Sequence, residues 1–505
     1  MNYNNNVEVL DRRRAGILMH PTSLPAGEAL GRLGQDSFRF IDFLADIGAT
    51  VWQLLPLGPT LENLSPYQTL SVHAGNTELI SLRRLHEWGW LPEEPICSGH
   101  NGLWREYHHY ELRRAYKMFM KRAAHEQKEA YSEFVSRHFN WLENYVLYLA
   151  LKARHDGAPW WEWEPELRDC EPRAIAAVQE ELAEELEQGR FEQFVFYYQW
   201  DQVKQYAHER GILLFGDMPI FVAHDSAEVW ARRDLFDLDD EGHPRTVAGV
   251  PPDYFSETGQ LWGNPHYNWD RMQADGFIWW KERLASQLEL FDLIRIDHFR
   301  GFEAFWSVPA HEETAINGHW VKAPGEALFD ALNERYGELP FVAEDLGIIT
   351  PEVDALRERY GLPGMKILQF AFGSGPENPY LCHNHEHNSV IYTGTHDNNT
   401  TLGWIEGCMP ELRMEIMDYF GNPREPMPWP MIRAALASVS RLAIIPFQDV
   451  LALDGKHRMN TPGVAEGNWQ WRFEWDWVTE ETRKRMSHLI CLDIGAGPHI
   501  QIKRL

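Results

Sequence analysis

The sequence is poor in cysteine and has no long apolar run. Its 505 residues include five cysteines, which are far apart and form no CxxC pair. This pattern argues against a disulfide framework and against a zinc site. No stretch approaches the roughly 18 uncharged apolar residues of a membrane span, and the N-terminus has no apolar signal-peptide core. We therefore expect a protein of the reducing cytoplasm.

Positive charge is also scarce. The chain has 47 Lys and Arg against 75 Asp and Glu, for a net charge of -28. A field of this sign repels phosphate backbones and anionic lipid headgroups, so we expect neither nucleic acid nor a membrane as a partner. Aromatic residues, in contrast, are abundant: 22 Trp, 18 Tyr and 25 Phe. They can fill a large core or form platforms for sugar rings, and composition alone does not choose.

Short apolar runs alternate with helical patterning along the whole chain. The eight runs are 16–19, 51–55, 212–216, 293–296, 341–343, 365–370, 390–393 and 443–447. Between the first two, apolar residues at 40, 43, 44 and 47 predict a helix, with Asp36 or Ser37 as its N-cap and Gly48 as its end. Eight strands with intervening helices predict an α/β fold, a TIM (β/α)8 barrel.

Two connections between these runs are too long for loops. Residues 56–211 contain long helical patterning and predict a mainly helical inserted subdomain. Residues 218–291 predict a second inserted subdomain, which begins in a segment rich in Pro, Gly and aromatics and ends in a helix. The predicted architecture is one catalytic barrel, 1–505, with large, mainly helical insertions at its C-terminal mouth.

Carboxylates follow several of the predicted strands. Asp217, Asp297 and Glu344 each continue the inward face of a run, and the seventh run is followed by Thr-His-Asp-Asn at 395–398. Catalytic groups of a barrel gather at this end of the strands. Arg295, on the same face as Asp297, should keep Asp297 ionised, while the cluster of like charges should hold a proton on a neighbouring acid. One anionic and one protonated carboxyl group are what glycoside chemistry requires.

Long motifs lie in a fixed order around these residues. They are SPY at 65–67, GDMPI at 216–220, GVPPDYFS at 249–256, GQLWGNP at 259–265, RIDHFRG at 295–301, AEDLG at 343–347, YTGTHDN at 392–398, RMNTPG at 458–463 and GNW at 467–469. In these motifs the sequence resembles the 4-alpha-glucanotransferases, or amylomaltases, which are relatives of the alpha-amylase group. The likeness extends from about Arg14 almost to the C-terminus.

The resemblance implies roles for individual residues. Asp297 matches the family's nucleophile, Glu344 its general acid and base, and Asp397 the third carboxylate, which binds sugar hydroxyls. The residues that match the lining of the subsite where the bond is cleaved are Tyr67, Asp217, Arg295 and His396, with His298 in a supporting role. The segment 249–265 matches the family's cleft-covering loop, in which Tyr254, Trp262 and Asn264 are expected substrate contacts and Gly259 and Gly263 permit tight turns.

The sequence also departs from the family in places. The segment 71–77 reads SVHAGNT, where many members have Ala-Phe after the serine and Pro after the asparagine. His383, His385 and His387 resemble metal ligands in their spacing, but we expect them to be solvated or to face sugar. The mechanism implied by the resemblance needs neither a metal nor an organic cofactor.

Three functions fit this sequence. The first is a retaining transferase that moves alpha-1,4-glucan segments from a donor to a sugar acceptor, such as maltooligosaccharides or starch- and glycogen-type glucans. The second is a hydrolase that uses the same machinery, and the third is a noncatalytic glucan-binding relative. The third is weakest, because every catalytic position of the family is filled. The sequence does not indicate chain-length preference, cyclic products, oligomeric state or optimal temperature.

Overall fold

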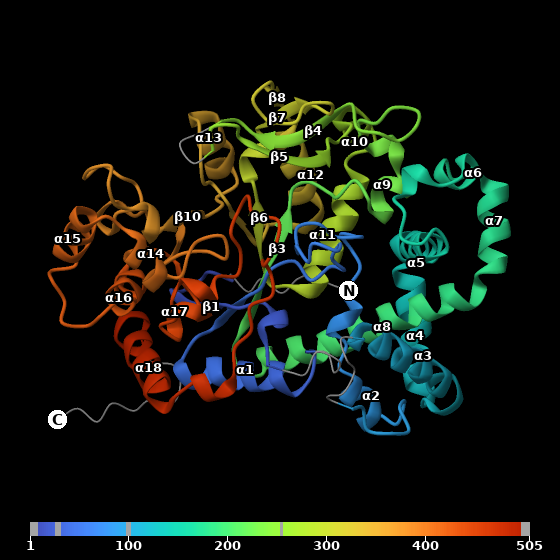
Figure 1. The fold of residues 1–505 in the computed structure, drawn as a ribbon, viewed down its shortest axis with the longest axis horizontal. Coiled ribbons are helices and arrows are strands. Elements are labelled where there is room, and N and C mark those ends of the chain that lie inside the picture. Colours follow the sequence, from blue (N-terminus) through green and yellow to red (C-terminus); the bar gives the residue numbers. More distant parts are fainter. Residues whose placement is uncertain (1–8, 26–31, 97–102, 253–255, 496–505) are drawn as a thin grey trace.

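A computed structural model describes residues 9–25, 32–96, 103–252 and 256–495. Eight parallel strands form one sheet in the order β10-β11-β12-β1-β2-β3-β6-β9 (Figure 1). They are β1 (Arg14–Leu18), β2 (Val51–Gln53), β3 (Leu213–Pro219), β6 (Leu293–Asp297), β9 (Phe341–Ala343), β10 (Gly364–Ile367), β11 (Ser389–Tyr392) and β12 (Leu442–Pro446). Each coincides with one of the predicted runs, so the predicted TIM barrel is confirmed.

The sheet closes on itself between its two outermost strands. The Ala343 N–H at the end of β9 donates to the carbonyl of Pro363, immediately before β10, at 2.9 Å. Alternate side chains fill the interior, among them Phe215, Leu293 and Val342. The outer faces pack under helices in a much larger apolar cluster. The alternation fixes which residues at the strand ends point into the mouth.

The first βαβ unit follows the predicted pattern. Helix α1 (Gln35–Ile47) buries Phe40, Phe43, Leu44 and Ile47 on the barrel and ends at Gly48, whose φ of 82° is readily adopted by glycine. Its N-cap is Gly34, so the predicted cap at Asp36 or Ser37 is wrong by two or three residues. Asp36 lies in the first turn of the helix, where its charge favours the N-terminal end of the dipole.

The connection between β2 and β3 is built from helices. They are α2 (Leu82–Glu87), α3 (Trp104–Arg122), α4 (His125–Arg137), α5 (Phe139–Arg154), α6 (Pro165–Arg168), α7 (Pro172–Glu181) and α8 (Ala183–His208). In Figure 1 these helices form the right-hand side of the molecule, and α8 returns the chain to the barrel. The division of the chain into subdomains stays a prediction.

The connection after β3 contains strands that the sequence pattern does not predict. Strands β4 (Thr246–Val250) and β5 (Gln260–Pro265) form a hairpin, which pairs with β7 (Ala304–Pro309) and β8 (His319–Lys322) in an antiparallel sheet of order β5-β4-β7-β8. Helices α9 (Ala227–Ala231), α10 (Trp269–Ala274) and α11 (Ile278–Leu290) complete this part. The small sheet lies beyond the barrel strands at the top of Figure 1.

The remaining helices cover the second half of the barrel. They are α12 (Gly325–Tyr336), α13 (Pro351–Arg359), α14 (Thr401–Gly407), α15 (Pro410–Tyr419), α16 (Trp429–Ala437), α17 (Phe447–Val450) and α18 (Glu480–Ile494). In the described part of the chain, none of the helices has both the length and the apolar character that crossing a membrane requires.

Candidate active site

The charged residues of the site lie on or just after three neighbouring strands, β3, β6 and β9. In the register of β3 and β6, Asp217 lies opposite Arg295, and Arg295 lies opposite Val342 of β9. Because Phe215, Leu293 and Val342 fill the barrel interior, the residues two positions later on each strand also point inward. Asp217, Arg295 and Glu344 therefore converge at one end of the barrel, and Asp297 follows at the end of β6.

The guanidinium of Arg295 joins two carboxylates. Nη1 donates to Asp217 Oδ2 at 2.7 Å, and Nη2 lies 2.9 Å from Asp297 Oδ1. The Asp217 side chain is fully buried, whereas that of Asp297 keeps 28% of its surface exposed. No described residue donates a hydrogen bond to the second oxygen of Asp297, Oδ2. Arg295 thus fixes one oxygen of Asp297 and leaves the other available for attack.

Burial affects the pKa of Asp297 more than Arg295 does. Burial raises the pKa of Asp297 to about 6, although Arg295 acts to lower it; the charges of Asp217 and Asp397 raise it further. Desolvation of the carboxylate therefore outweighs the nearby guanidinium. At neutral pH Asp297 is still mainly ionised, but it takes up a proton within about one pH unit below neutrality.

Glu344 lies directly after β9 and is held by two main-chain groups. The His298 N–H donates to Oε2 at 2.7 Å, and the Leu346 N–H donates to Oε1 at 2.9 Å. Burial raises the pKa of Glu344 to about 7; Arg295 and the two N–H donors act to lower it, and Asp297 to raise it. Between pH 6 and 7 a single proton on the Asp297–Glu344 pair therefore favours Glu344.

A network of polar side chains extends from Asp217 to Asp397. The Tyr67 hydroxyl donates to Asp217 Oδ2 at 3.0 Å, so it accepts from His396 Nε2, which lies 2.9 Å away. His396 Nε2 is also 3.3 Å from Asp397 Oδ2, and its ring stacks on Tyr67 at 5.3 Å between centroids. Together with Arg295, these contacts join six of the predicted site residues in one network.

Asp397 is held ionised by its neighbours. Burial acts to raise its pKa, but His396 and a hydrogen bond from Asn460 Nδ2 to Asp397 Oδ1, 2.7 Å long, hold the pKa well below its usual range. Arg458 Nη2 donates to the main-chain carbonyl of Asp397 at 3.0 Å. The rings of Tyr67 and His396 lie 5.9 and 6.0 Å from that of Trp469. Asn460, Arg458 and Trp469 were not predicted as site residues, although all three lie in the motifs at 458–463 and 467–469.

His298 and Trp262 lie on the Glu344 side. His298 has a φ of 53°, a left-handed conformation that is uncommon outside glycine, and this conformation accompanies the N–H donation to Glu344. Its ring is buried, which lowers its pKa to about 3, and Trp262 packs edge-on against it at 4.8 Å. The predicted cleft-covering segment is the β4–β5 hairpin, with positive φ at Gly259 and Gly263 as expected.

Asn264, a further predicted contact, is not part of this network. Asn264 is buried, donates to the carbonyl of Val222 at 2.9 Å and accepts from Gln68 at 3.5 Å. Because both of these hydrogen bonds are to protein groups, the expected contact between Asn264 and a sugar stays a prediction. Tyr254 lies outside the described residues.

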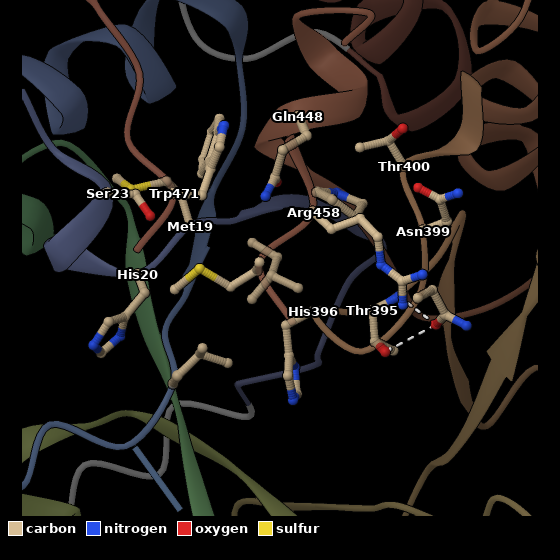
Figure 2. A pocket seen from close by; sticks show the side chains of 15 residues that line it. Met19, His20, Ser23, Thr395, His396, Asn399, Thr400, Gln448, Arg458 and Trp471 are labelled. Atoms are coloured by element: carbon tan, nitrogen blue, oxygen red, sulfur yellow. Dashed lines mark hydrogen bonds between the residues drawn. The ribbon is translucent and has the colours of Figure 1, made fainter. Parts of the chain in front are cut away.

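A small cavity lies behind His396 (Figure 2). The rings of His20 and His396 point toward the same side of it, while Trp471, Gln448 and Thr400 lie at the other end. The cavity is about 30 Å³, far below the roughly 300–1,000 Å³ of small-molecule sites. Burial and the charge of His396 lower the pKa of His20 to about 3. His20, another residue that was not predicted, is therefore a neutral part of the wall behind the site.

The histidines at 383 and 385 have protein partners. His383 Nδ1 lies 3.2 Å from the Tyr419 hydroxyl, and His385 Nδ1 lies 2.9 Å from Ser438 Oγ. His383 is nevertheless exposed to solvent, as expected, whereas His385 is half-buried and bonded on both ring nitrogens, so the expectation is wrong for His385. Among the described residues, no group of three or more His, Cys, Asp or Glu side chains is arranged to hold a metal ion.

The fold and this geometry define a class of enzyme. A barrel mouth that holds an ionised carboxylate with a free oxygen, a carboxyl group that retains its proton near neutrality, and a third carboxylate beside stacked rings is suited to cleaving glycosidic bonds.

Comparison with known proteins gives the family. The family model for 4-alpha-glucanotransferase matches residues 19–479. The 4-alpha-glucanotransferase of Thermus thermophilus is 50% identical over 472 residues, which cover 91% of this chain and 94% of that protein. The Synechocystis enzyme of the same name is 46% identical over 484 residues, covering 94% and 96%. The structure of an amylomaltase from Streptococcus agalactiae in complex with acarbose superposes with a TM-score of 0.91 at 36% identity, covering 95% and 99%. The chain therefore belongs to the 4-alpha-glucanotransferase family.

Proposed function

We propose that this protein transfers segments of alpha-1,4-glucans from a donor chain to a sugar acceptor by a retaining, two-step displacement. The observation that carries the proposal is that Asp297 and Glu344 differ in their contacts and in their proton affinities. Asp297 has one oxygen fixed by Arg295 and one free, and Glu344 has the higher proton affinity. The donors and acceptors are maltooligosaccharides and starch- or glycogen-type glucans.

In the first step, Asp297 Oδ2 attacks the anomeric carbon of the donor. The bond from that carbon to the glycosidic oxygen breaks, and Glu344 gives its proton to the departing oxygen. This leaves a glycosyl ester on Asp297 and an ionised Glu344. Arg295 stays bound to Oδ1 and so holds the Asp297 carboxyl group in place while it changes from a charged carboxylate to a neutral ester.

In the second step, an acceptor hydroxyl loses its proton to Glu344 and attacks the same carbon. The ester bond to Asp297 breaks, and both carboxyl groups return to their starting protonation. Two inversions give overall retention of the alpha configuration. No external cofactor is required for this balance.

The remaining polar residues bind and orient the sugar at the cleaved bond. Asp397 is ionised and can accept two hydroxyl hydrogens, an interaction that strengthens as the ring distorts. The stacked rings of Tyr67 and His396 present an apolar surface beside Asp397. We infer that Trp262, on the β4–β5 hairpin, and Tyr254 stack on glucose units, with Asn264 and His298 in support.

Transfer and hydrolysis share the first step and differ in what reaches the ester. We infer that the β4–β5 hairpin, which carries Trp262 beside His298, covers the cleft and so favours a sugar over water, because a covered cleft lowers water access. A noncatalytic role is disfavoured, since a binding protein has no need of a free nucleophile oxygen beside a protonated acid.

Incubation with pure maltotriose tests the proposal. Transfer predicts glucose together with maltooligosaccharides longer than the substrate, while total reducing ends stay nearly constant. A steady rise in reducing ends without longer products would establish the hydrolase, and unchanged substrate would support the binding protein. The Asp297→Ala protein serves as the inactive control.

A further inference from the structure

A second, larger cavity lies outside the candidate active site. It measures about 530 Å³, which falls in the usual range of small-molecule sites. Its walls come from the junction of α4 and α5, from α9 and from α11. In Figure 1 α5 and α9 lie on the right of the molecule, with α11 between them and the barrel strands.

The aromatic part of the wall is Trp141 at the start of α5. Its indole is half-buried and stacks on His73 at 5.8 Å between centroids, with 15° between the planes. Its Nε1 donates to His138 Nδ1 at 3.2 Å, so the ring is held from two sides. A fixed indole at the edge of a cavity offers an apolar face to a sugar ring.

The charged side chains of the wall already have protein partners. Glu143 is bound by Arg190 through two contacts of 2.6 and 2.8 Å, and Arg232 bonds Asp234 at 3.2 Å. A charged ligand would have to break such pairs, whereas a neutral polyol can use their remaining lone pairs and hydrogens. The wall therefore favours an uncharged, hydroxyl-rich molecule.

Two polar atoms at the wall lack hydrogen-bond partners among the described residues, and one of them, Glu228 Oε2, is fully buried. Ser286 Oγ donates to the Arg283 carbonyl and so accepts from His73 Nδ1 at 2.8 Å, which leaves His73 Nε2 as an acceptor without a partner among the described residues. Glu228 Oε1 is bonded by Ser71, while its Oε2 has no hydrogen-bond partner in the described chain. Both side chains are more than nine-tenths buried and line the cavity. An unpaired buried polar atom such as Glu228 Oε2 is costly, and a hydroxyl-bearing ligand can supply its missing partner.

One residue of the wall joins this cavity to the candidate active site. His73 also lines a pocket that includes Tyr67, Ser71 and Asp217, so this residue lies in the wall of both spaces. It belongs to the segment 71–77, in which the chain has Val-His where many family members have Ala-Phe.

From this cavity we propose a second glucan-binding site, in which Trp141 stacks on a glucose ring and His73 and Glu228 bind its hydroxyls. The choice of an alpha-glucan among neutral polyols rests on the proposed function. A chain held here is kept near the active site, so the site favours long substrates over short ones.

Titration calorimetry with maltoheptaose on the Asp297→Ala protein tests this directly. We expect two classes of binding site, and only one after Ala285→Trp is added, because Ala285 lies half-buried in the cavity wall and tryptophan fills it. Ala274→Trp, on the exposed end of α10, is the matched control and should keep both classes. A single class in the Asp297→Ala protein, or two classes that persist after Ala285→Trp, would overturn the proposal.

Kinetics separate this inference from the proposed function. In the active enzyme, Ala285→Trp should raise KM for amylose by about 3- to 10-fold and leave kcat and the maltotriose constants unchanged. Trp141→Phe, which keeps aromatic packing on His73, should raise the same KM by less. Equal KM values for amylose in all these proteins would contradict the second site, whereas absence of maltotriose disproportionation in the unmodified enzyme would contradict the proposed function.

Discussion

The pKa of Asp297 is lower than that of Glu344, which is the order that the reaction needs. Activity requires Asp297 ionised and Glu344 protonated, and burial raises the pKa of Asp297 to about 6 and that of Glu344 to about 7. We therefore expect a bell-shaped dependence of kcat/KM on pH with its maximum between about 6 and 7. Below it Asp297 takes up a proton, and above it Glu344 loses one. A flat profile from pH 5 to 9 would show that this pair does not control the reaction.

Arg295 is the only residue that the structure places on both Asp217 and Asp297 within the described chain. Arg295→Lys keeps the charge but loses the planar guanidinium that contacts both carboxylates at once, so we expect kcat to fall roughly 10- to 100-fold. Arg295→Met should lose more. Because Arg295 lowers the pKa of Asp297, its removal should move the acidic limb of the pH profile to higher pH.

Thermal unfolding distinguishes this role from a structural one. If Arg295 merely neutralised the barrel interior, the main effect of Arg295→Met would be a large loss of stability with no shift of the acidic limb. A folded Arg295→Met protein with nearly full activity and an unmoved limb would contradict the assignment.

Asn460 positions Asp397 through a single hydrogen bond to Oδ1. Asn460→Ala removes the donor, and we expect kcat/KM on maltotriose to fall about 10- to 100-fold with little change in the unfolding midpoint. Asn460→Asp has the same shape but places a like charge beside Asp397, so its loss should be larger. Unchanged activity of the Asn460→Ala protein would contradict a positioning role for this hydrogen bond.

The sequence predicts some site residues better than others for a physical reason. Asp217, Asp297 and Glu344 lie near or just after the carboxyl ends of strands, and strand alternation alone places them together. Asn460 and Trp469 lie in an irregular segment after β12, where no periodicity indicates direction. The rise that burial causes in the pKa of Asp297 was not predicted, because burial cannot be measured from sequence.

At the scale of elements, one cluster fastens α5 to the segment after β3. The Tyr148 hydroxyl and Lys152 Nζ both donate to Asp225, each at 2.5 Å, and the Lys152 and Asp225 side chains are largely buried. Tyr148→Phe removes one bond to a charged group without changing shape, so the free energy of unfolding should fall by about 1.5–3 kcal/mol. Chemical denaturation measures this.

A matched tyrosine provides the control for that experiment. The hydroxyl of Tyr131 bonds Glu187 at 3.0 Å, and the Glu187 side chain is 44% exposed. Tyr131→Phe should therefore cost less than Tyr148→Phe, because solvent can replace the lost partner. The reverse order would show that Asp225 does not fasten the helices to the barrel.

The barrel strands were predictable and the small antiparallel sheet was not. Each barrel strand is a short apolar run because both of its faces are buried. Strand β8, in contrast, reads His-Trp-Val-Lys with little burial, and β5 is exposed over most of its length. Such strands are held by pairing with neighbours rather than by an apolar face, so no sequence pattern marks them.

At the scale of the whole molecule, the net charge of -28 predicts how catalysis responds to salt. A glucan is neutral, so the long-range field of the protein neither attracts nor repels it. We expect kcat/KM on maltotriose to stay within about twofold between 0.05 and 0.5 M salt, a range in which screening changes strongly. A steep decline would indicate that a charged group on the surface participates in substrate capture.

The covalent glycosyl-enzyme is the most direct test of the central claim, which is that Asp297 attacks and Glu344 supplies the proton. In the Glu344→Gln protein, an alpha-maltotriosyl fluoride needs no proton to leave, so the ester should form and then accumulate because no base activates the acceptor. Mass spectrometry of the digested protein should find the added sugar on Asp297. No adduct, or an adduct on Asp217 or Asp397 in its place, would contradict the account.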